Sequence, residues 1–523
     1  MIGRRAWLAA GMAVLAARGA GAQRGGASVA LPVKLDDTVV GPHERAVLLC
    51  WGDRIAYDAP PWDPLNPSAE AAEAQFGWDA RIVALIEPPP AADGIPRAIL
   101  AIAHPTVDPR MAFPGGWDRP EVAAAMQGAT LINLMRQDGG WRVVDGGYQT
   151  RRITARTLCR LSGPVAETIG SVATGMLGVS GGAATPWGTL LLTEGDPAPW
   201  VARLGGAVDA ARFGWVAELD PLDPLAVPAK RTALGRFAHG DAAAALAADG
   251  RAVVYMTDRR PGGYLFRFVS EGPATEPDAL DRGTLFVARF ERGEGMRWLP
   301  LPAGAESARD PVAAAEALEP TPLDTPSGLA VDPRRPRLFL ACRGAPPGPR
   351  GSAGSVIEIL PAAGDHAAET AVGQVLLVGS EPPPLPPRSG RSGAAQEAPP
   401  LPPARPAMPD TLAMDPNGRR LWIGTNHGGL VGRQADALYA CTIEGPSRGQ
   451  ALPIYAAPRA AAIGGVAVSP DGTALFTVAR RPGAEPGASF ERPGTRWPAF
   501  DPAVPPRTAL LSLTRRGGGM VGG

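Results

Sequence analysis

The sequence predicts an all-β protein, folded as a β-propeller with irregular insertions and a few short helices. One observation is a repeated unit, in which an apolar strand, a turn containing Asp-Pro or Pro-Asp-Gly, and a second apolar strand follow one another. Another is composition, because 66 glycines and 59 prolines make up almost a quarter of the 523 residues. Such a share favours many short strands joined by tight turns. Segments with helical spacing of apolar residues are also scarce.

The repeated unit supports blades in particular. Alternating apolar residues give each strand a buried face, and Asp and Gly at the turn permit a tight hairpin. The copies recur at irregular spacings, which indicates propeller blades with variable insertions. A β-sandwich with similar hairpins is the alternative. The clear copies span 328–341, 412–425 and 466–478, with weaker relatives at 247–256 and 283–288.

Other segments are expected to interrupt or flank this single domain, which we place at residues 23–516. Two alanine-rich stretches, 68–75 and 241–248, are predicted to be short helices at the rim. A proline-rich loop is expected at about 382–409, because proline cannot donate to a sheet ladder. Residues 517–523 should form a flexible tail.

The four cysteines, Cys50, Cys159, Cys342 and Cys441, are far apart in the sequence and lack the spacing of zinc ligands. We expect buried small side chains and leave one disulfide open.

The N-terminus has the features of a signal peptide over residues 1–22. Arg4-Arg5 precedes an apolar run through Ala17, and Ala20-Gly21-Ala22 provides small residues for cleavage. The paired arginines favour the twin-arginine export route over the general secretory route. The apolar run falls short of the ~20 residues that cross a bilayer, so no membrane anchor is expected. These features predict a periplasmic or secreted protein.

Charge and motif content exclude several classes of function. Lysine plus arginine equals aspartate plus glutamate at 51 each, which argues against a nucleic-acid-binding protein. No P-loop, GxSxG elbow or HExxH helix is present. A serine hydrolase built on Ser180 would need His239 as its base, and a structural role for that histidine is favoured. A monomer that binds a small anionic molecule, such as a phosphate compound, is the expected state.

An ordered set of segments covers most of the mature chain and resembles the PhoX-type alkaline phosphatases. The segments include Trp51-Gly-Asp53, Gln75-Phe-Gly-Trp78, Arg151-Arg-Ile-Thr154, Gly181-Gly-Ala-Ala-Thr-Pro-Trp-Gly-Thr189, Gly214-Trp-Val-Ala-Glu-Leu-Asp-Pro221, Lys230-Arg-Thr-Ala-Leu-Gly-Arg-Phe237, Val254-Tyr-Met-Thr-Asp258, Gly283-Thr-Leu-Phe-Val-Ala-Arg289, Trp298-Leu-Pro-Leu301, Ser469-Pro-Asp-Gly472 and Arg496-Trp-Pro498. The resemblance implies a propeller, twin-arginine export, and a cluster of iron and calcium ions that hydrolyses phosphomonoesters.

The chain departs from the family pattern where metal ligands are implied. The bridging cysteine is replaced by Ser180, and three further ligand positions are arginine: Arg81, Arg259 and Arg480. The remaining departures are His239-Gly240-Asp241 for His-Glu-Gly, Thr325-Pro326-Ser327 for Arg-Pro-Glu, and Ala103-His104-Pro105 for Asn-His-Glu. Calcium and bridged ferric iron need several anionic ligands, so a cluster with these losses should not assemble.

Two sets of site residues follow from the comparison with the family pattern. Any retained metal ligands would be Glu194, Glu218 and Asp258. Arg259, Arg480 and Arg343 are instead predicted to form a cationic mouth for an anion, because guanidinium groups match phosphate and carboxylate. The sequence thus favours a PhoX-like protein that has lost turnover, and the alternative is a divergent alkaline phosphatase with a reduced or altered calcium and iron site.

Overall fold

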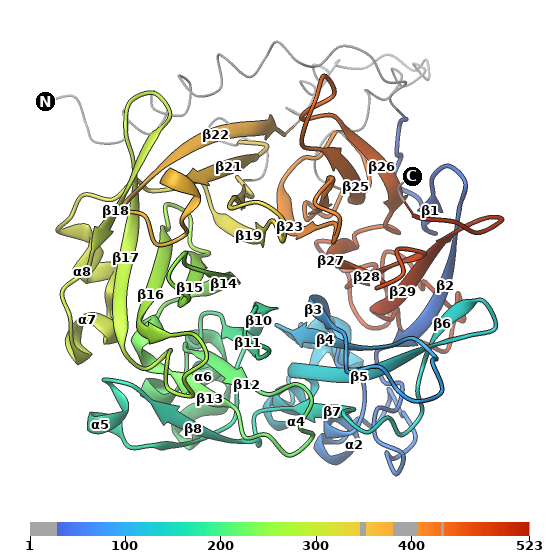
Figure 1. The fold of residues 1–523 in the computed structure, drawn as a ribbon. Helices are drawn as coiled ribbons and strands as arrows, with labels where there is room; N and C mark the ends of the chain where they lie inside the picture. Colours follow the sequence, from blue (N-terminus) through green and yellow to red (C-terminus); the bar gives the residue numbers. More distant parts are fainter. Residues whose placement is uncertain (1–28, 346–351, 380–404, 430–432, 522–523) are drawn as a thin grey trace, which may run out of the picture.

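The computed structural model describes residues 29–345, 352–379, 405–429 and 433–521. The predicted signal peptide, most of the proline-rich loop and the last two residues lie outside these ranges. Within them, the strands form six radial blades around a central axis (Figure 1), and the third and fourth blades are continuous as one nine-stranded sheet. The predicted β-propeller is therefore confirmed, and the β-sandwich alternative is wrong.

The first three blades follow one another along the chain, each running outward from an inner strand. The first blade consists of β3 (Arg81–Ile86), β4 (Arg97–His104), β5 (Gly128–Gln137) and β6 (Gly140–Val143), with β7 (Arg151–Ile153) on β5. The second consists of β10 (Val179–Ala184), β11 (Leu190–Glu194), β12 (Val216–Leu219) and β13 (Ala229–Arg231), extended by β8 (Leu158–Ser162) and β9 (Val172–Thr174). The third consists of β14 (His239–Leu246), β15 (Arg251–Asp258), β16 (Leu265–Pro273), β17 (Gly283–Phe290) and β18 (Gly295–Pro300).

The next three blades complete the ring. Strand β2 comes from the N-terminal part of the chain but pairs with β29 in the last blade, which ties the two ends of the domain together. The fourth blade consists of β19 (Pro326–Val331), β20 (Leu338–Cys342), β21 (Ser355–Pro361) and β22 (Thr370–Val378). The fifth consists of β23 (Pro409–Met414), β24 (Arg420–Thr425), β25 (Ala437–Thr442) and β26 (Ala451–Ala456), with β1 (Thr38–Val39). The sixth consists of β27 (Ala462–Val468), β28 (Ala474–Arg480), β29 (Ala509–Arg515) and β2 (His43–Cys50).

The three clear sequence repeats are the inner hairpins of the last three blades: β19–β20, β23–β24 and β27–β28. Each inner strand contacts the inner strand of the next blade, in the order β3, β10, β14, β19, β23, β27 and back to β3. Residues at the same height on neighbouring inner strands are thereby brought together, although they are far apart in the sequence.

Short helices occupy the connections between strands. The segment predicted at 68–75 forms one of them, capped by Ser68. The helices are α2 (Ala69–Glu73), α3 (Pro109–Ala112), α4 (Pro120–Met126), α5 (Ala166–Ile169), α6 (Ala198–Leu204), α7 (Ala305–Arg309) and α8 (Pro311–Glu316), and the 3₁₀ turns are η1 (Pro114–Gly116), η2 (Gly205–Ala207), η3 (Ala210–Arg212), η4 (Thr232–Leu234) and η5 (Ala362–Gly364).

The helix predicted at 241–248 is wrong, because these residues lie in strand β14 and the turn after it. Ala243 and Ala245 pack toward the fourth blade, whereas Ala242 and Ala244 pack toward the second. Alternating burial on two faces is the signature of a strand. Inner strands lie close to the channel axis, where blades converge, and short side chains fit that space. Packing between blades thus overrides the helical propensity of alanine.

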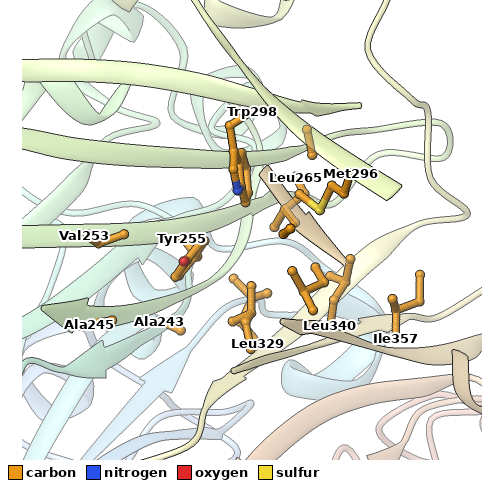
Figure 2. Packing of buried hydrophobic residues seen from close by; sticks show 14 of the residues in the cluster. Ala243, Ala245, Val253, Tyr255, Leu265, Met296, Trp298, Leu329, Leu340 and Ile357 are labelled. Carbon is orange, nitrogen blue, oxygen red and sulfur yellow. The ribbon is translucent and has the colours of Figure 1, made fainter. Parts of the chain in front are cut away.

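The hydrophobic core lies between successive blades. In Figure 2, Tyr255 and Trp298 of the third blade face Leu329 and Leu340 of the fourth. All four cysteines are buried in this packing and are free thiols, so the disulfide left open does not form.

The C-terminal tail is more ordered than expected as far as it is described. The backbone N–H of Val521 donates to the carbonyl of Gly472 at 3.0 Å, and the Val521 side chain is buried. No helix among the described residues is both long enough and apolar enough to cross a bilayer.

Candidate functional site: an arginine cluster at one end of the channel

The candidate site lies where inner strands begin and the second strands of their blades end. The pairs Arg81↔Ala103, His239↔Asp258 and Pro409↔Thr425 mark this level in three blades. In the last blade, Arg480 occupies the equivalent end of β28. Contacts between these ends bring together five arginines and three aspartates: Arg81, Arg259, Arg343, Arg480, Arg481, Asp79, Asp241 and Asp410.

Arg480 is held by Asp79 from the loop before β3. Its Nε and Nη2 donate to the two carboxylate oxygens at 2.9 and 2.6 Å, a bidentate geometry. Both side chains are almost fully buried. Burial opposes ionisation of Asp79, but Arg480 and Arg481 hold the pKa of its carboxyl below the usual value. Arg480 is therefore a fixed charge with one nitrogen, Nη1, that has no hydrogen-bond partner among the described residues.

Asp410, the second residue of β23, is the negative centre of the cluster. Its Oδ1 accepts from Arg259 Nη2 at 2.8 Å, and its Oδ2 accepts from Asn426 Nδ2 at 3.0 Å. Arg480 Nη1 lies 3.7 Å from Oδ2. Burial opposes ionisation, but four surrounding arginines hold the pKa of Asp410 far below its usual range. Asp410 is thus an obligate anion that joins three blades.

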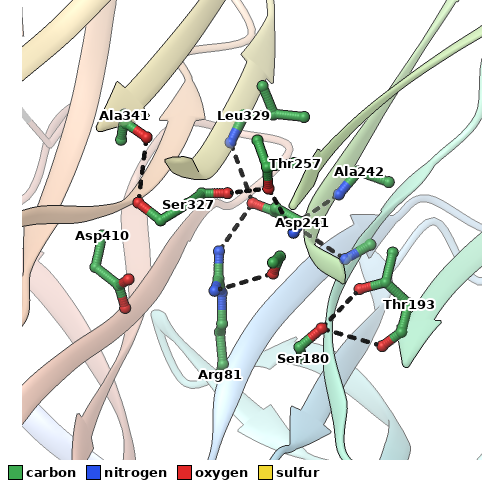
Figure 3. Close-up of polar contacts among 12 residues, drawn as sticks. Arg81, Ser180, Thr193, Asp241, Ala242, Thr257, Ser327, Leu329, Ala341 and Asp410 are labelled. Atoms are coloured by element: carbon green, nitrogen blue, oxygen red, sulfur yellow. Dashed lines mark hydrogen bonds and ion pairs between the residues drawn. The ribbon is translucent and has the colours of Figure 1, made fainter. Parts of the chain in front are cut away.

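Arg81 and Asp241 close the channel side of the cluster. In Figure 3, Arg81 points toward Asp241, and the Nη2–Oδ2 distance is 2.8 Å. Asp241 also accepts backbone N–H groups from Gly182 at 3.0 Å and Leu329 at 3.2 Å. One carboxylate therefore binds elements of four blades. Its bonds to protein leave it little capacity to ligate a metal.

Arg343 and Arg481 are not paired in this way. Arg343 follows β20 and has no ion pair within 4 Å among the described residues, and its buried Nε has no hydrogen-bond partner there. The nearest carboxylate oxygen to Arg481 lies 3.7 Å from its Nε, on Asp79, which is already bound by Arg480. The Arg481 side chain is 31 % exposed. These two arginines carry the unneutralised charge of the cluster.

Neighbouring charges and burial also shift the pKa of Arg259. Asp410 raises the pKa of Arg259, but burial and the charges of Arg81, Arg343 and Arg480 outweigh it and lower the pKa to about 10. Arg259 stays protonated at neutral pH. Burial is the largest of the lowering effects, and repulsion from the three arginines adds to it. An anion at this site would meet the same positive charges.

The serines at implied ligand positions are used by the fold. Ser180 Oγ donates to the carbonyl of His239 at 2.7 Å and lies 3.0 Å from Thr193 Oγ1. Ser327 Oγ lies 3.3 Å from the carbonyls of Ala341 and Pro409. Figure 3 shows both side chains turned into the strands around them.

Ser180 and His239 do not form a catalytic pair. The His239 ring contacts the Gly235 carbonyl through Nε2 at 3.2 Å and packs on Phe237, and it does not reach Ser180. Burial lowers the pKa of His239 to about 3, so the ring is neutral at physiological pH. The ring is packed inside the fold, and its Nδ1 has no hydrogen-bond partner among the described residues.

Glu194, the first candidate metal ligand, is fully buried at the end of β11. Its Oε1 accepts from Lys230 Nζ at 2.9 Å and from the N–H of Leu177 at 2.8 Å. Its Oε2 accepts the N–H groups of Gly214 and Trp215 at 3.0 and 3.1 Å. Four donors, one of them cationic, occupy the carboxylate.

Glu218 and Asp258 are similarly engaged. Glu218 accepts from Arg231 Nε at 2.8 Å, and Arg231 also binds Asp281. Asp258 is bound by Arg260, with Nη2 to Oδ2 at 2.7 Å. The structure therefore gives each of the three candidate carboxylates its own cation and does not gather them. Over the described ranges, no three His, Cys, Asp or Glu side chains are arranged to hold a metal ion.

A cavity of about 400 Å³ lies along the channel beyond the Arg81–Asp241 pair. Its walls come from the inner strands of all six blades, and Arg81 and Asp241 line it together with apolar side chains such as Val83, Leu412 and Val466. The Arg81–Asp241 ion pair is therefore shared by the wall of this cavity and the charged end.

Sequence reasoning identified Arg259, Arg343 and Arg480 but missed Arg481 and the three aspartates as their partners. One signal was present. Pro409-Asp410 begins β23 just as Pro326-Ser327 begins β19, and the preceding Met408 and Thr325 both have a positive φ, 51° and 54°. Asp410 thus occupies in its blade the place of an implied ligand in the neighbouring blade.

Known proteins share this architecture. A family model described as alkaline phosphatase PhoX matches residues 28–483. The chain belongs to the PhoX family. The structure of Pseudomonas fluorescens PhoX in complex with vanadate, a transition state analogue, superposes with a TM-score of 0.80 at 26 % identity, over 95 % of this chain and 98 % of that one. The resemblance inferred from the sequence is confirmed.

Other matches are more distant. A proposed 6-phosphogluconolactonase from Bacteroides uniformis aligns over 75 % of this chain and 76 % of its own, but with 12 % identity and a TM-score of only 0.32. No curated protein is matched by sequence. The PhoX family and its propeller are thus what the comparisons establish.

Proposed function

We propose that this chain is an exported PhoX-family protein that binds a small anion at the arginine cluster and does not assemble the family's iron and calcium ions. The observation that carries the proposal is that, among the described residues, Arg343 has no ion pair and Arg481 comes no nearer than 3.7 Å to a carboxylate oxygen, while the aspartates of the cluster are already paired with other arginines. A guanidinium group with free N–H donors in a partly buried site is suited to an oxyanion.

The donor chemistry argues against the metal cluster. Hard cations need several free anionic oxygens, and Glu194, Glu218 and Asp258 are bound by Lys230, Arg231 and Arg260 instead. The cluster itself holds five guanidinium groups, which repel a divalent or trivalent cation. The residues present therefore do not fit the iron and calcium ions that the family implies, and no catalytic step is derived through them.

Export is part of the same proposal. The Arg4-Arg5 pair, the apolar run and the small residues before Gln23 support transport by the twin-arginine route to the periplasm or outside the cell. The ligand would then be an extracytoplasmic anion. A monomer suits this role, because the binding groups all come from one chain.

A divergent alkaline phosphatase is the second candidate function. The match to the vanadate complex of Pseudomonas fluorescens PhoX over almost the whole chain favours it. On this reading, a reduced or altered calcium and iron site would have to release Glu194, Glu218 or Asp258 from its present cation.

A phosphatase assay separates the two candidates. We expect purified mature protein to hydrolyse para-nitrophenyl phosphate no faster than the buffer does, with or without added calcium and iron. Pseudomonas fluorescens PhoX, assayed in parallel, is the positive control. Turnover that requires the added metals and disappears with a chelator would establish the phosphatase and reject the proposal.

A further inference from the structure

We infer that the arginine cluster selects doubly charged oxyanions, such as sulfate and hydrogen phosphate, over singly charged ones. The inference rests on the proposed function, because it concerns the same site. It specifies the charge of the preferred ligand and the residues that determine this preference. It concerns binding alone and includes no hydrolytic step.

The charges of the cluster do not balance. Five arginines and three aspartates leave an excess of two positive charges at the end of the channel. The three aspartates are committed: Asp241 to Arg81, Asp79 to Arg480, and Asp410 to Arg259 and Asn426. The excess therefore belongs to Arg343 and Arg481, and a dianion would neutralise it.

The cluster also has hydrogen-bond donors that the protein does not use. Arg343 Nε and Arg480 Nη1 are buried and have no acceptor among the described residues. A buried donor without an acceptor is costly, so a ligand oxygen at these atoms gains free energy from more than charge alone. These two donors come from different blades of the cluster, and such a set suits a ligand with several oxygens.

Part of the cluster is accessible to solvent. The side chains of Arg259 and Arg481 are 25 % and 31 % exposed, whereas Arg81 and Arg480 are buried. Solvent thus reaches the unneutralised side of the cluster, and the Arg81–Asp241 pair closes the other side. A ligand would approach Arg259, Arg343 and Arg481 and would leave the aspartate pairs intact.

Calorimetric titration of the metal-free mature protein tests the inference. At pH 8 and matched ionic strength, sulfate and inorganic phosphate should bind at least about tenfold more tightly than nitrate or acetate. Arg343→Gln and Arg481→Gln should each weaken sulfate binding by about tenfold or more, because each removes a charged donor. Arg343→Lys should weaken binding less and keep the preference for dianions.

Arg282→Gln is the matched control, because Arg282 and its partner Asp278 are 65 % and 50 % exposed and do not belong to the arginine cluster. Its sulfate affinity should stay within about twofold of wild type. Circular dichroism checks that each variant is folded. Glycerol 2-phosphate, titrated alongside phosphate, shows whether an organic ester or the free ion is preferred, and either preference supports a dianion site.

The failures of the two proposals are distinguishable. Nitrate or acetate binding as tightly as sulfate would overturn the charge selection and leave anion binding intact. Absence of binding for every anion, or binding only with added calcium and iron, would overturn the proposed function itself.

Discussion

Replacing Asp410 by asparagine should destabilise the protein by about 3–5 kcal/mol at pH 7, because removing one partner of a buried ion pair leaves the other charge uncompensated. Asp410 is fully buried and bridges Arg259, Asn426 and Arg480. Asparagine keeps the size of the side chain and its hydrogen-bonding oxygen. The loss of stability would therefore measure how much the negative charge of Asp410 contributes at the centre of the arginine cluster.

The effect should depend on pH in a defined direction. The pKa of Asp410 is lower in the folded protein than its usual value, because the surrounding arginines outweigh burial. A lowered pKa contributes stability that is fully present above the unfolded pKa of about 3.9 and is lost as the pH falls toward the folded value. The difference in stability between wild type and Asp410→Asn should therefore narrow below about pH 4.

Urea unfolding followed by tryptophan fluorescence at pH 7 and at lower pH measures this. Asp278→Asn is the matched control, since Asp278 and its partner Arg282 are 50 % and 65 % exposed. It should change stability by no more than about 0.5 kcal/mol. If Asp410→Asn lost as little stability as the control, the negative charge of Asp410 would not be needed to hold the surrounding arginines in the folded protein.

The Glu194–Lys230 pair should show an equally large effect. Both side chains are fully buried, and Lys230 also lies 4.3 Å from the Phe213 ring centroid. Glu194→Gln and Lys230→Met should each destabilise the metal-free protein by about 3–5 kcal/mol, because each leaves a buried charge unpaired. The double variant should lose less than the sum of the two, since neither charge then remains.

The same urea titration, with calcium and iron removed, measures these variants. A Glu194→Gln variant as stable as wild type without metal, but impaired in metal binding, would contradict the structural role of Glu194. It would support the divergent phosphatase instead.

The propeller could be predicted because its signals are local. The turn residues of 328–341, 412–425 and 466–478 specify hairpins wherever they occur in the chain. The Ala242–Ala245 strand could not be predicted, because its conformation depends on neighbouring blades rather than on its own residues.

The sequence predicted arginines of the site but not their partners, because the partners of these arginines depend on contacts between blades. Comparison with the family pattern locates Arg259 and Arg480 at strand ends. It does not reveal that Arg480 pairs with Asp79, because the two residues are 401 positions apart in the sequence. Glu194 fits a ligand position in the sequence, yet Lys230 and three backbone N–H groups bind it in the fold. Only closure of the ring establishes these partners.

Metal analysis of the mature protein, purified from its own host without added metals, tests the central claim most directly. The arginine cluster and the paired carboxylates predict iron and calcium well below one ion per chain, with an intact fold by circular dichroism. Stoichiometric iron together with calcium would contradict the account, because the carboxylates would then have to leave the cations that hold them here.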